Sequence, residues 1–373
     1  MAIPRSAAVA ATALVLAGLA LPSPASARTV DDAGGAHTVV PAGAGGGHGP
    51  LLWFNTPTGS TDEFRGLSAV SGRVAWVSGE TGTVLRTVTR GRIWQDVSPP
   101  GAAGLALRDI EAFDADHAVA LSIGPGKSSG IFTTNDGGTT WTRTFTNRNR
   151  SAFYDCMAFS DDGVGLAMSD PVNGRFRLVT SPDRGQTWHL LIPQQMPMAL
   201  DGEFAFAASG TCIVPGPGHQ FWIATGGVAK PRVFHTYDAG LHWTVVQTPV
   251  RGGPSAGIYS IAFRNAMQGV AVGGDYTKPG AGAHAAATSY DGGTTWIRSG
   301  RPVAGYRSGV DYVSSKLVVA VGPTGSDFSR SGGVRWLHFD DTRYDAISCT
   351  DAGACWGSGT EGNVARLLHY SAP

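Results

Sequence analysis

The chain has 373 residues, of which 53 are glycine, about twice the usual share. Its 28 basic and 28 acidic residues cancel, and charged residues make up only 15% of the chain. A neutral chain has no global electrostatic reason to bind nucleic acid, frequent glycine disfavours a helical bundle, and 42% hydrophobic residues disfavour wholesale disorder. These exclusions leave a folded, turn-rich, all-β protein.

Residues 1–27 have the pattern of a secretory signal peptide. Arg5 gives a short positive start, residues 7–21 are apolar, and Ala25 and Ala27 supply the small-x-small pattern that precedes a cleavage site. The alternative is a retained anchor helix, although the apolar run is short for a membrane span. We therefore expect cleavage near Ala27, no transmembrane segment in the remaining chain, and a secreted or extracytoplasmic protein.

The next segment, residues 28–49, is rich in Gly and Ala and has no apolar period. This composition predicts a flexible spacer. Internal repeats occupy the remaining chain, and we expect residues 50–373 to form a single domain.

The repeat is a motif of the form Ser/Thr-x-Asp-x-Gly-x-Thr-Trp. In a tight turn, an Asp can accept hydrogen bonds from backbone amides, and a Gly can take a positive φ. We therefore predict a structural and not a catalytic role for the four Asp residues of the motif. They are Asp136, Asp183, Asp238 and Asp291. Two further copies, at residues 89–94 and 331–336, keep the Gly and the Trp but lack the Asp.

Each period also predicts four short strands. Residues 110–113 are typical of a first strand and residues 270–274 of a second, while a third strand leads into the turn and a fourth begins at the Trp. Four strands in about 45 residues are the signature of a β-propeller blade. We predict seven blades, with six or eight as alternatives. Residues 344–370 would form the last blade, whose missing outer strand residues 51–56 would supply.

The turn motif resembles the Asp-box, or BNR repeat, of sialidases and other propellers. The wider pattern resembles the photosystem II stability/assembly factor-like family of WD40/YVTN/BNR-like, sialidase-like propellers. This resemblance rests on residues 64–70 (FRGLSAV), 75–79 (AWVSG), 82–87 (GTVLRT), 169–172 (SDPV), 206–211 (FAASGT), 273–276 (GGDY) and 305–308 (GYRS). It implies an exported propeller that binds another macromolecule, and it implies no particular reaction.

A ligand site is expected where the inner strands begin, because the loops between second and third strands open on the same face. Aligning the blades places these residues at equivalent positions: Arg65, Arg108, Tyr154, Phe204, Ile258, Arg307 and Tyr344. The three arginines could converge on one carboxylate or phosphate. The predicted ligand-binding residues are Arg65, Arg108, Arg307, Asp170, Asp275 and Tyr276. The alternative is that these charges pair with one another across blades as structural bridges.

Three functions are compatible with these residues. We predict a non-catalytic binding or assembly module for a protein or an anionic ligand such as a carboxylate or glycan. The alternative is a sialidase-like glycoside hydrolase that uses Asp155, Glu203 and Tyr344, although the Pro of the sialidase start motif is absent after Arg65 and sialidase propellers have six blades. A third alternative is an oxidoreductase with a cofactor at the centre of the ring. The chain has no dinucleotide fingerprint and no CxxC motif, so we predict no cofactor.

The four cysteines allow three disulfide pairings. Cys349 and Cys355 lie on consecutive predicted strands, which favours a bridge within the last blade. Cys156 could then pair with Cys212 and join the third and fourth blades. The spacing of the Cys and His residues predicts no metal site, and we expect a monomer that binds no nucleic acid.

Overall fold

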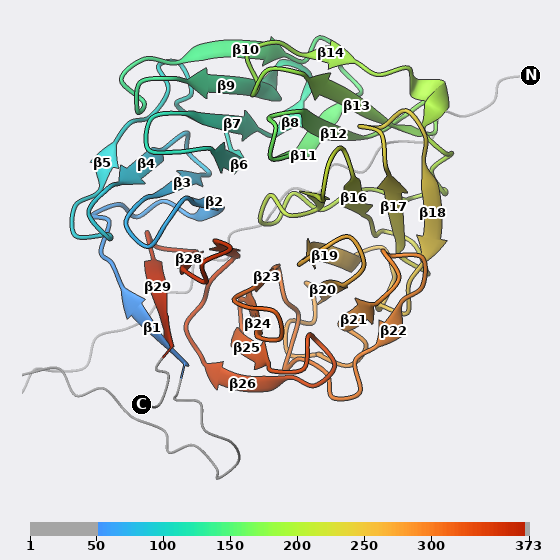
Figure 1. Ribbon diagram of the computed structural model, residues 1–373. Coiled ribbons are helices and arrows are strands. Elements are labelled where there is room, and N and C mark those ends of the chain that lie inside the picture. The colour runs from blue at the N-terminus through green and yellow to red at the C-terminus, as the bar shows by residue number, and fades with distance from the viewer. Residues whose placement is uncertain (1–50, 370–373) are drawn as a thin grey trace, which may run out of the picture. The chain divides into compact units, whose positions relative to one another are not determined.

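The structure is a computed structural model, and it describes residues 51–369. Those residues form seven antiparallel sheets arranged as the blades of a propeller (Figure 1). This arrangement confirms the predicted all-β, seven-bladed fold. The predicted signal peptide and spacer lie outside the described residues.

The innermost strand of each blade precedes the others in the chain, except in the last blade. From the inside outwards, blade 1 contains β2 (Phe64–Ala69), β3 (Ala75–Gly79), β4 (Val84–Thr87) and β5 (Gln95–Asp96). Blade 2 contains β6 (Leu107–Ala112), β7 (Ala118–Ser122), β9 (Gly130–Thr134) and β10 (Thr142–Thr146). Blade 3 contains β11 (Phe153–Phe159), β12 (Gly165–Val172), β13 (Arg175–Ser181) and β14 (His189–Leu190). The short strand β8 (Gly124–Pro125) pairs with the start of β11.

The remaining blades follow the same order. Blade 4 contains β15 (Ile213–Pro215), β16 (Phe221–Ala224), β17 (Arg232–Thr236) and β18 (Thr244–Gln247). Blade 5 contains β19 (Ala256–Phe263), β20 (Gly269–Asp275), β21 (Ala286–Ser289) and β22 (Ile297–Arg298). Blade 6 contains β23 (Gly309–Tyr312), β24 (Val318–Gly322), β25 (Gly325–Ser329) and β26 (Leu337–Asp340). Two short 3-10 helices, η1 (Gly126–Ser128) and η2 (Pro193–Gln195), interrupt the loops.

Blade 7 joins the two ends of the described chain. Its strands are β27 (Ala346–Cys349), β28 (Cys355–Ser358), β29 (Val364–His369) and, as the outermost strand, β1 (Leu51–Asn55). Trp53 of β1 lies opposite Leu367 of β29, and its indole Nε1 donates to Ser326 Oγ in blade 6 at 3.0 Å. The predicted closure by residues 51–56 is therefore confirmed, and it removes the free edges that an open ring would have.

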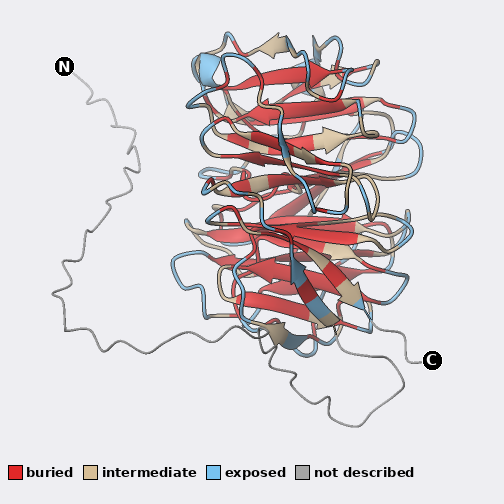
Figure 2. Ribbon diagram, turned by 90° about the vertical axis from the view of Figure 1, so that its left-hand side faces the viewer, coloured by how far each residue is buried: buried red, intermediate tan, exposed pale blue. Residues whose placement is uncertain are grey.

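The core lies between the blades. Every residue of β3, β7 and β24 is buried, because each of these second strands is covered by a neighbouring blade on both faces (Figure 2). Large aromatic rings fill the spaces between blades, as where Trp222 of blade 4 stacks on Phe263 of blade 5 with ring centroids 3.8 Å apart. The small and β-branched residues of these strands suit a sheet that is buried on both faces.

The four turns that contain Asp share one hydrogen-bond pattern. Asp136 Oδ1 accepts from the backbone N–H of Thr140 at 2.8 Å, and its Oδ2 accepts from Thr140 Oγ1 at 2.6 Å. The hydroxyl of Thr140 and its amide together lower the pKa of Asp136. Asp183, Asp238 and Asp291 accept equivalent bonds. These carboxylates therefore hold the turn in each of these four blades, and in blade 2 Gly138 completes it at φ +85°.

Hydrogen bonds also tie the inner strands of neighbouring blades together. Ser68 Oγ in blade 1 accepts from the N–H of Ala112 in blade 2 at 3.0 Å. Asp109 in blade 2 accepts from Met157 in blade 3 at 2.6 Å, and Asp311 in blade 6 accepts from Cys349 in blade 7 at 2.7 Å. Side chains of the inner strands thus satisfy backbone donors that have no partner strand further inside.

Both disulfides join the pairs that the sequence favours. Cys349 bonds to Cys355 between two adjacent strands of blade 7. Cys156 of β11 bonds to Cys212, which directly precedes β15. The second bridge therefore fixes the segment that enters blade 4 to the inner strand of blade 3.

Candidate functional site

Four inner strands contain a β-bulge near their first residue. The extra residue of the bulge is Arg65 in β2, Arg108 in β6, Asp155 in β11 and Tyr259 in β19. A bulge turns its extra side chain away from the regular alternation of the strand. These four side chains therefore belong to the same end of the ring, which we call the mouth.

The sequence alignment was wrong by one residue in at least three blades, of which blades 3 and 5 are described first. Tyr154 and Ile258, which it placed beside Arg65, are 0% exposed and pack in the core. The residues that follow them, Asp155 and Tyr259, occupy the bulge instead. A sequence pattern does not reveal where a strand gains an extra residue, so the alignment could not detect this shift.

Arg65 and Arg108 meet on one carboxylate. Arg108 Nε lies 2.6 Å from Glu80 Oε1, and Arg65 Nε lies 3.1 Å from the same oxygen. Arg65 also contacts Glu63 at 2.5 Å and Asp345 at 3.6 Å. We call these five residues the mouth cluster. Burial opposes the charge of Arg65, but the three carboxylates outweigh it and raise the pKa of Arg65.

Arg307 does not join the mouth cluster. Gly309 pairs with Val321 as Gly66 pairs with Ser78, which places Arg307 at the position of the buried Phe64 and not at that of Arg65. Its side chain is 0% exposed, and both its Nε and its Nη2 contact Asp327 Oδ2 at 2.7 Å. The expectation of three converging arginines is therefore wrong, and Arg307 forms a buried structural pair as the alternative interpretation predicts.

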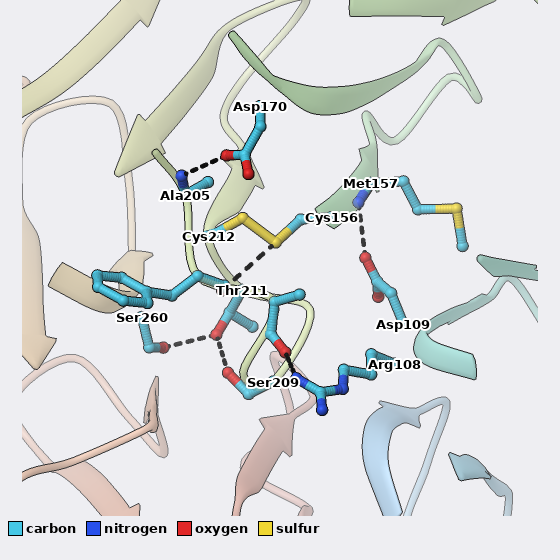
Figure 3. Close-up of a disulfide and its surroundings, with 12 residues drawn as sticks. Arg108, Asp109, Cys156, Met157, Asp170, Ala205, Ser209, Thr211, Cys212 and Ser260 are labelled. Atoms are coloured by element: carbon cyan, nitrogen blue, oxygen red, sulfur yellow. Dashed lines mark hydrogen bonds between the residues drawn. A yellow bond between two sulfur atoms is a disulfide. The ribbon is translucent and has the colours of Figure 1, made fainter. Parts of the chain in front are cut away.

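A segment of the chain lies across the mouth. Residues 205–211, which we call the plug, follow β14 and precede β15. Figure 3 shows three of them, Ala205, Ser209 and Thr211. Arg108 Nη1 donates to Ala207 O at 3.0 Å, and Arg65 Nη1 donates to Ala208 O at 3.3 Å. Ser209 Oγ donates to Ser308 O at 2.7 Å. The plug thus contacts blades 1, 2 and 6, and the two arginines hold it from one side.

Hydrogen bonds and a ring contact hold the opposite side of the plug. The N–H of Ala205 donates to Asp170 Oδ1 in blade 3 at 3.0 Å, and Thr211 Oγ1 lies 2.6 Å from Ser260 Oγ in blade 5 (Figure 3). Phe206 stacks on Tyr259 with ring centroids 3.7 Å apart. The disulfide at Cys212 fixes the end of the segment. We infer that the plug is a rigid part of the mouth.

Asp155 and Asp170 form a carboxyl pair beside the plug. Burial, together with the charge of Asp170, raises the pKa of Asp155 well above its usual value. Burial also raises the pKa of Asp170 to about 7. Two carboxyl groups that are close and buried cannot both ionise easily, so the pair shares a proton near neutral pH. Burial likewise raises the pKa of Glu111 in blade 2 to about 8 and the pKa of Asp311 in blade 6 to about 7.

The three residues of the predicted hydrolase set do not come together. Glu203 binds Arg232 through both carboxylate oxygens and also accepts from Thr225 Oγ1 at 2.7 Å. Tyr344 is 4% exposed and packs against Trp53, with ring centroids 4.8 Å apart. Asp155 is on blade 3, beside Asp170. Of the three residues, Asp155 alone lies near an arginine of the mouth, Arg108. A nucleophile and an acid therefore do not face one space in this arrangement.

The remaining predicted ligand residues, Asp275 and Tyr276, lie at the end of β20 and directly after it. Asp275 accepts from Ser255 Oγ at 2.8 Å and from Thr277 Oγ1 at 2.6 Å, which orders the loop after β20. Tyr276 beside it is 55% exposed. Sequence reasoning did not select Glu80 or Tyr306 for the site. Glu80 directly follows β3, and the sequence analysis expected loops between second and third strands to open on the ligand face, so this expectation could have identified it. Tyr306 packs on Tyr259, with ring centroids 4.6 Å apart.

Within residues 51–369, no group of three His, Cys, Asp or Glu side chains is placed to hold a metal ion. In the same part of the chain, no helix is long and apolar enough to cross a membrane.

Comparisons with known proteins support the fold. No family model and no curated protein matches the chain. Among solved structures, "YCF48 bound to D1 peptide" is 13% identical with a TM-score of 0.60 and covers 86% of this chain and 97% of that chain. YCF48 from Cyanidioschyzon merolae is 13% identical with a TM-score of 0.61 and coverages of 84% and 98%. U3-55K is 12% identical with a TM-score of 0.59 and coverages of 85% and 98%. The fold is thus similar to that of the photosystem II assembly factor YCF48, in agreement with the resemblance in the sequence.

Proposed function

We propose that this protein is an exported, non-catalytic Asp-box propeller that binds an acidic segment of a partner protein at the mouth. The observation that carries the proposal is the mouth cluster. The side chains of Arg65 and Arg108 are 22% and 30% exposed while their neighbours fix them in place. Because the two guanidinium groups are already paired with carboxylates of this chain, an acidic segment would bind by displacing the partly exposed Glu63 or Glu80. Guanidinium groups that are already ordered lose little entropy in such an exchange, so they suit recognition of an acidic segment.

Two further observations support a binding function. The plug gives the mouth a rigid floor, and the exposed ring of Tyr276 adds an aromatic contact of the kind enriched at interfaces. The similar propeller YCF48 is bound to D1 peptide in its solved structure. Glu203 is paired with Arg232 and Tyr344 packs against Trp53, so the geometry favours binding over hydrolysis of a glycoside.

Export is supported by the cysteines. All four form disulfides, and disulfides persist mainly in oxidising compartments outside the cytoplasm. The signal-peptide pattern of residues 1–27 agrees with this location. Cleavage is tested by sequencing the N-terminus of the mature protein, which we expect to begin near Arg28.

The binding proposal is tested with an array of acidic peptides, each made with a free carboxyl end and as an amide. We expect selected peptides to bind, and the double variant Arg65→Gln/Arg108→Gln to weaken binding by at least about tenfold, because each charge-assisted hydrogen bond contributes about 1.5–3 kcal/mol. Fluorescence anisotropy measures the affinity. The matched control is Arg298→Gln/Arg301→Gln, which removes the same charge from exposed positions.

Two results would contradict the proposal. One is equal binding by the double variant and its control, and the other is an array in which no acidic peptide binds. Turnover of a fluorogenic sialoside that Asp155→Asn abolishes would establish the hydrolase instead.

A further inference from the structure

A basic cavity lies at the end of blades 7 and 1 opposite the mouth. An open cavity of about 320 Å³ is lined there by Arg73, Arg90 and Arg366, with Trp356 and Leu367 among its apolar lining residues. The mouth is at the start of β2, whereas Arg73 follows the end of β2, so strand β2 separates the two sites. We call this site the seam cavity, because β1 and β29 close the ring in the same blade.

Three different elements bring the arginines to this cavity. Arg73 lies in the turn between β2 and β3, and Arg90 lies in the turn that follows β4. The N–H of Arg90 donates to Arg73 O at 3.0 Å, which joins the two turns. Arg366 belongs to β29, and its guanidinium lies 5.8 Å from the ring centroid of Phe54 on β1. A backbone hydrogen bond therefore fixes Arg73 and Arg90 relative to each other, and the contact with Phe54 positions the side chain of Arg366.

The arginines of the seam cavity have no counter-charges among the described residues. Within residues 51–369, none of the three makes an ion pair, and no Asp or Glu lines the cavity. Burial, with the positive charge of Arg90 added, lowers the pKa of Arg366. Three cations in one cavity repel one another, and an anion would relieve that repulsion.

The sequence explains why the carboxylate is missing. In the intact turns, Asp136 and its equivalents place a negative charge at this position of the blade. Blade 1 has Thr89 there, whose Oγ1 accepts from the N–H of Ile93 at 2.9 Å and so replaces the carboxylate as the turn acceptor. The turn keeps its hydrogen bond and loses its charge. The next residue is Arg90, at φ +65°.

We propose that the seam cavity binds a small organic molecule that carries a phosphate or sulfate ester group. Planar guanidinium groups match the oxygens of these tetrahedral anions, and several of them can bind one group. A cavity of about 320 Å³ exceeds the size of an inorganic ion and is within the range of small-molecule sites. The half-buried side chains of Ala354 and Leu368, which also line the cavity, would contact the organic part of the ligand. This site is separate from the mouth and does not depend on the partner proposed there.

The test is isothermal titration calorimetry of the full chain at low salt with glucose 6-phosphate, glucose 6-sulfate and glucose. We expect at least one ester to bind and glucose not to bind, and the stronger ester identifies the source of the anion. Arg90→Gln and Arg366→Gln should each weaken binding by at least about tenfold, since each removes charge-assisted hydrogen bonds. Raising the salt concentration should also weaken it.

The control is Arg148→Gln. Arg148 lines the other basic cavity, together with Lys127 and Arg150, so this variant removes the same charge at a different site. It should leave the affinity unchanged. The proposal is overturned if neither ester binds, if glucose binds as well as the esters, or if Arg148→Gln weakens binding as much as Arg90→Gln does. Arg90 is exposed in a turn, so its variant separates loss of binding from loss of folding.

Discussion

The mouth and the seam cavity both contain arginines, but they differ in counter-charge. Arg65 contacts three carboxylates and a backbone carbonyl, and Arg307 has a buried partner in Asp327. Arg366 at the seam cavity has no acidic partner within residues 51–369. The difference teaches that counter-charge and exposure together set the role of an arginine. Arg307 is buried with its partner and stabilises the fold, Arg65 is paired but partly exposed and can bind an anion only by exchanging a carboxylate, and Arg366 has no carboxylate to exchange in the described part of the chain.

The largest effect should come from the most buried pair. Asp327→Asn leaves the guanidinium of Arg307 charged, 0% exposed and without its carboxylate. Removing one member of a buried ion pair costs about 3–5 kcal/mol. We therefore expect the free energy of unfolding, measured by urea denaturation, to fall by about that amount.

Two variants check this interpretation. Asp341→Asn removes an acidic group that is 97% exposed and contacts only His338, so it should change stability by less than about 0.5 kcal/mol. The double variant Arg307→Met/Asp327→Leu removes both charges and should recover most of the loss. A loss that persists in full in the double variant would show that packing, and not the unpaired charge, causes the effect.

The fold was predictable because its signals are periodic. The Trp and Gly of each turn recur at blade spacing, and residues 51–56 match the strand that blade 7 lacks. The site was predictable only in part. Arg65 and Arg108 came from a repeated position, but Arg307 follows the register of Phe64, and the sequence shows no sign of that shift.

The plug was not predicted for a different reason. Residues 205–211 are uncharged and, apart from Phe206, small. Residues 206–211 contribute to the family resemblance, but that resemblance does not place them at the mouth. Their place depends on long-range contacts, such as the carbonyl of Ala207 with Arg108 and the disulfide from Cys212 to Cys156. A single sequence favoured the disulfide pairing but could not show that the intervening segment crosses the centre of the ring.

The second largest effect should be a pH dependence of stability that arises from the carboxyl group of Asp170 beside the mouth. Asp170 has a pKa of about 7 in the folded protein and about 4 in the unfolded chain. Between these values the native state holds a proton that the unfolded chain has released, so the contribution of Asp170 to stability is fully present below about pH 4 and is lost as the pH rises from about 4 to about 7. One proton accounts for at most about 1.4 kcal/mol per pH unit. Asp170→Asn should make the curve flatter in urea denaturation at several pH values.

Three other carboxyl groups should account for the slope of stability against pH that remains in Asp170→Asn. Asp155, Glu111 and Asp311 also have raised pKa values and act in the same direction. Asp291→Asn is the control, because its hydrogen bonds lower the pKa of Asp291 and it stays ionised throughout this range. That variant should shift the whole curve without changing its slope. An unchanged slope in Asp170→Asn would mean that the carboxyl pair does not hold the shared proton.

The smallest effect should be found at the seam cavity. Arg366→Gln removes a charge that has no carboxylate partner in residues 51–369, so the free energy of unfolding should change by less than about 0.5 kcal/mol. The lost contact with Phe54 and the relieved repulsion from Arg90 act in opposite directions. Added salt should reduce the repulsion in the unmodified protein. If Arg366→Gln instead destabilises the protein by more than about 1.5 kcal/mol, Arg366 is a structural residue like Arg307, and the contrast between the two regions fails. A small change in stability together with a large loss of ester binding would show that the seam cavity keeps its arginines for a ligand.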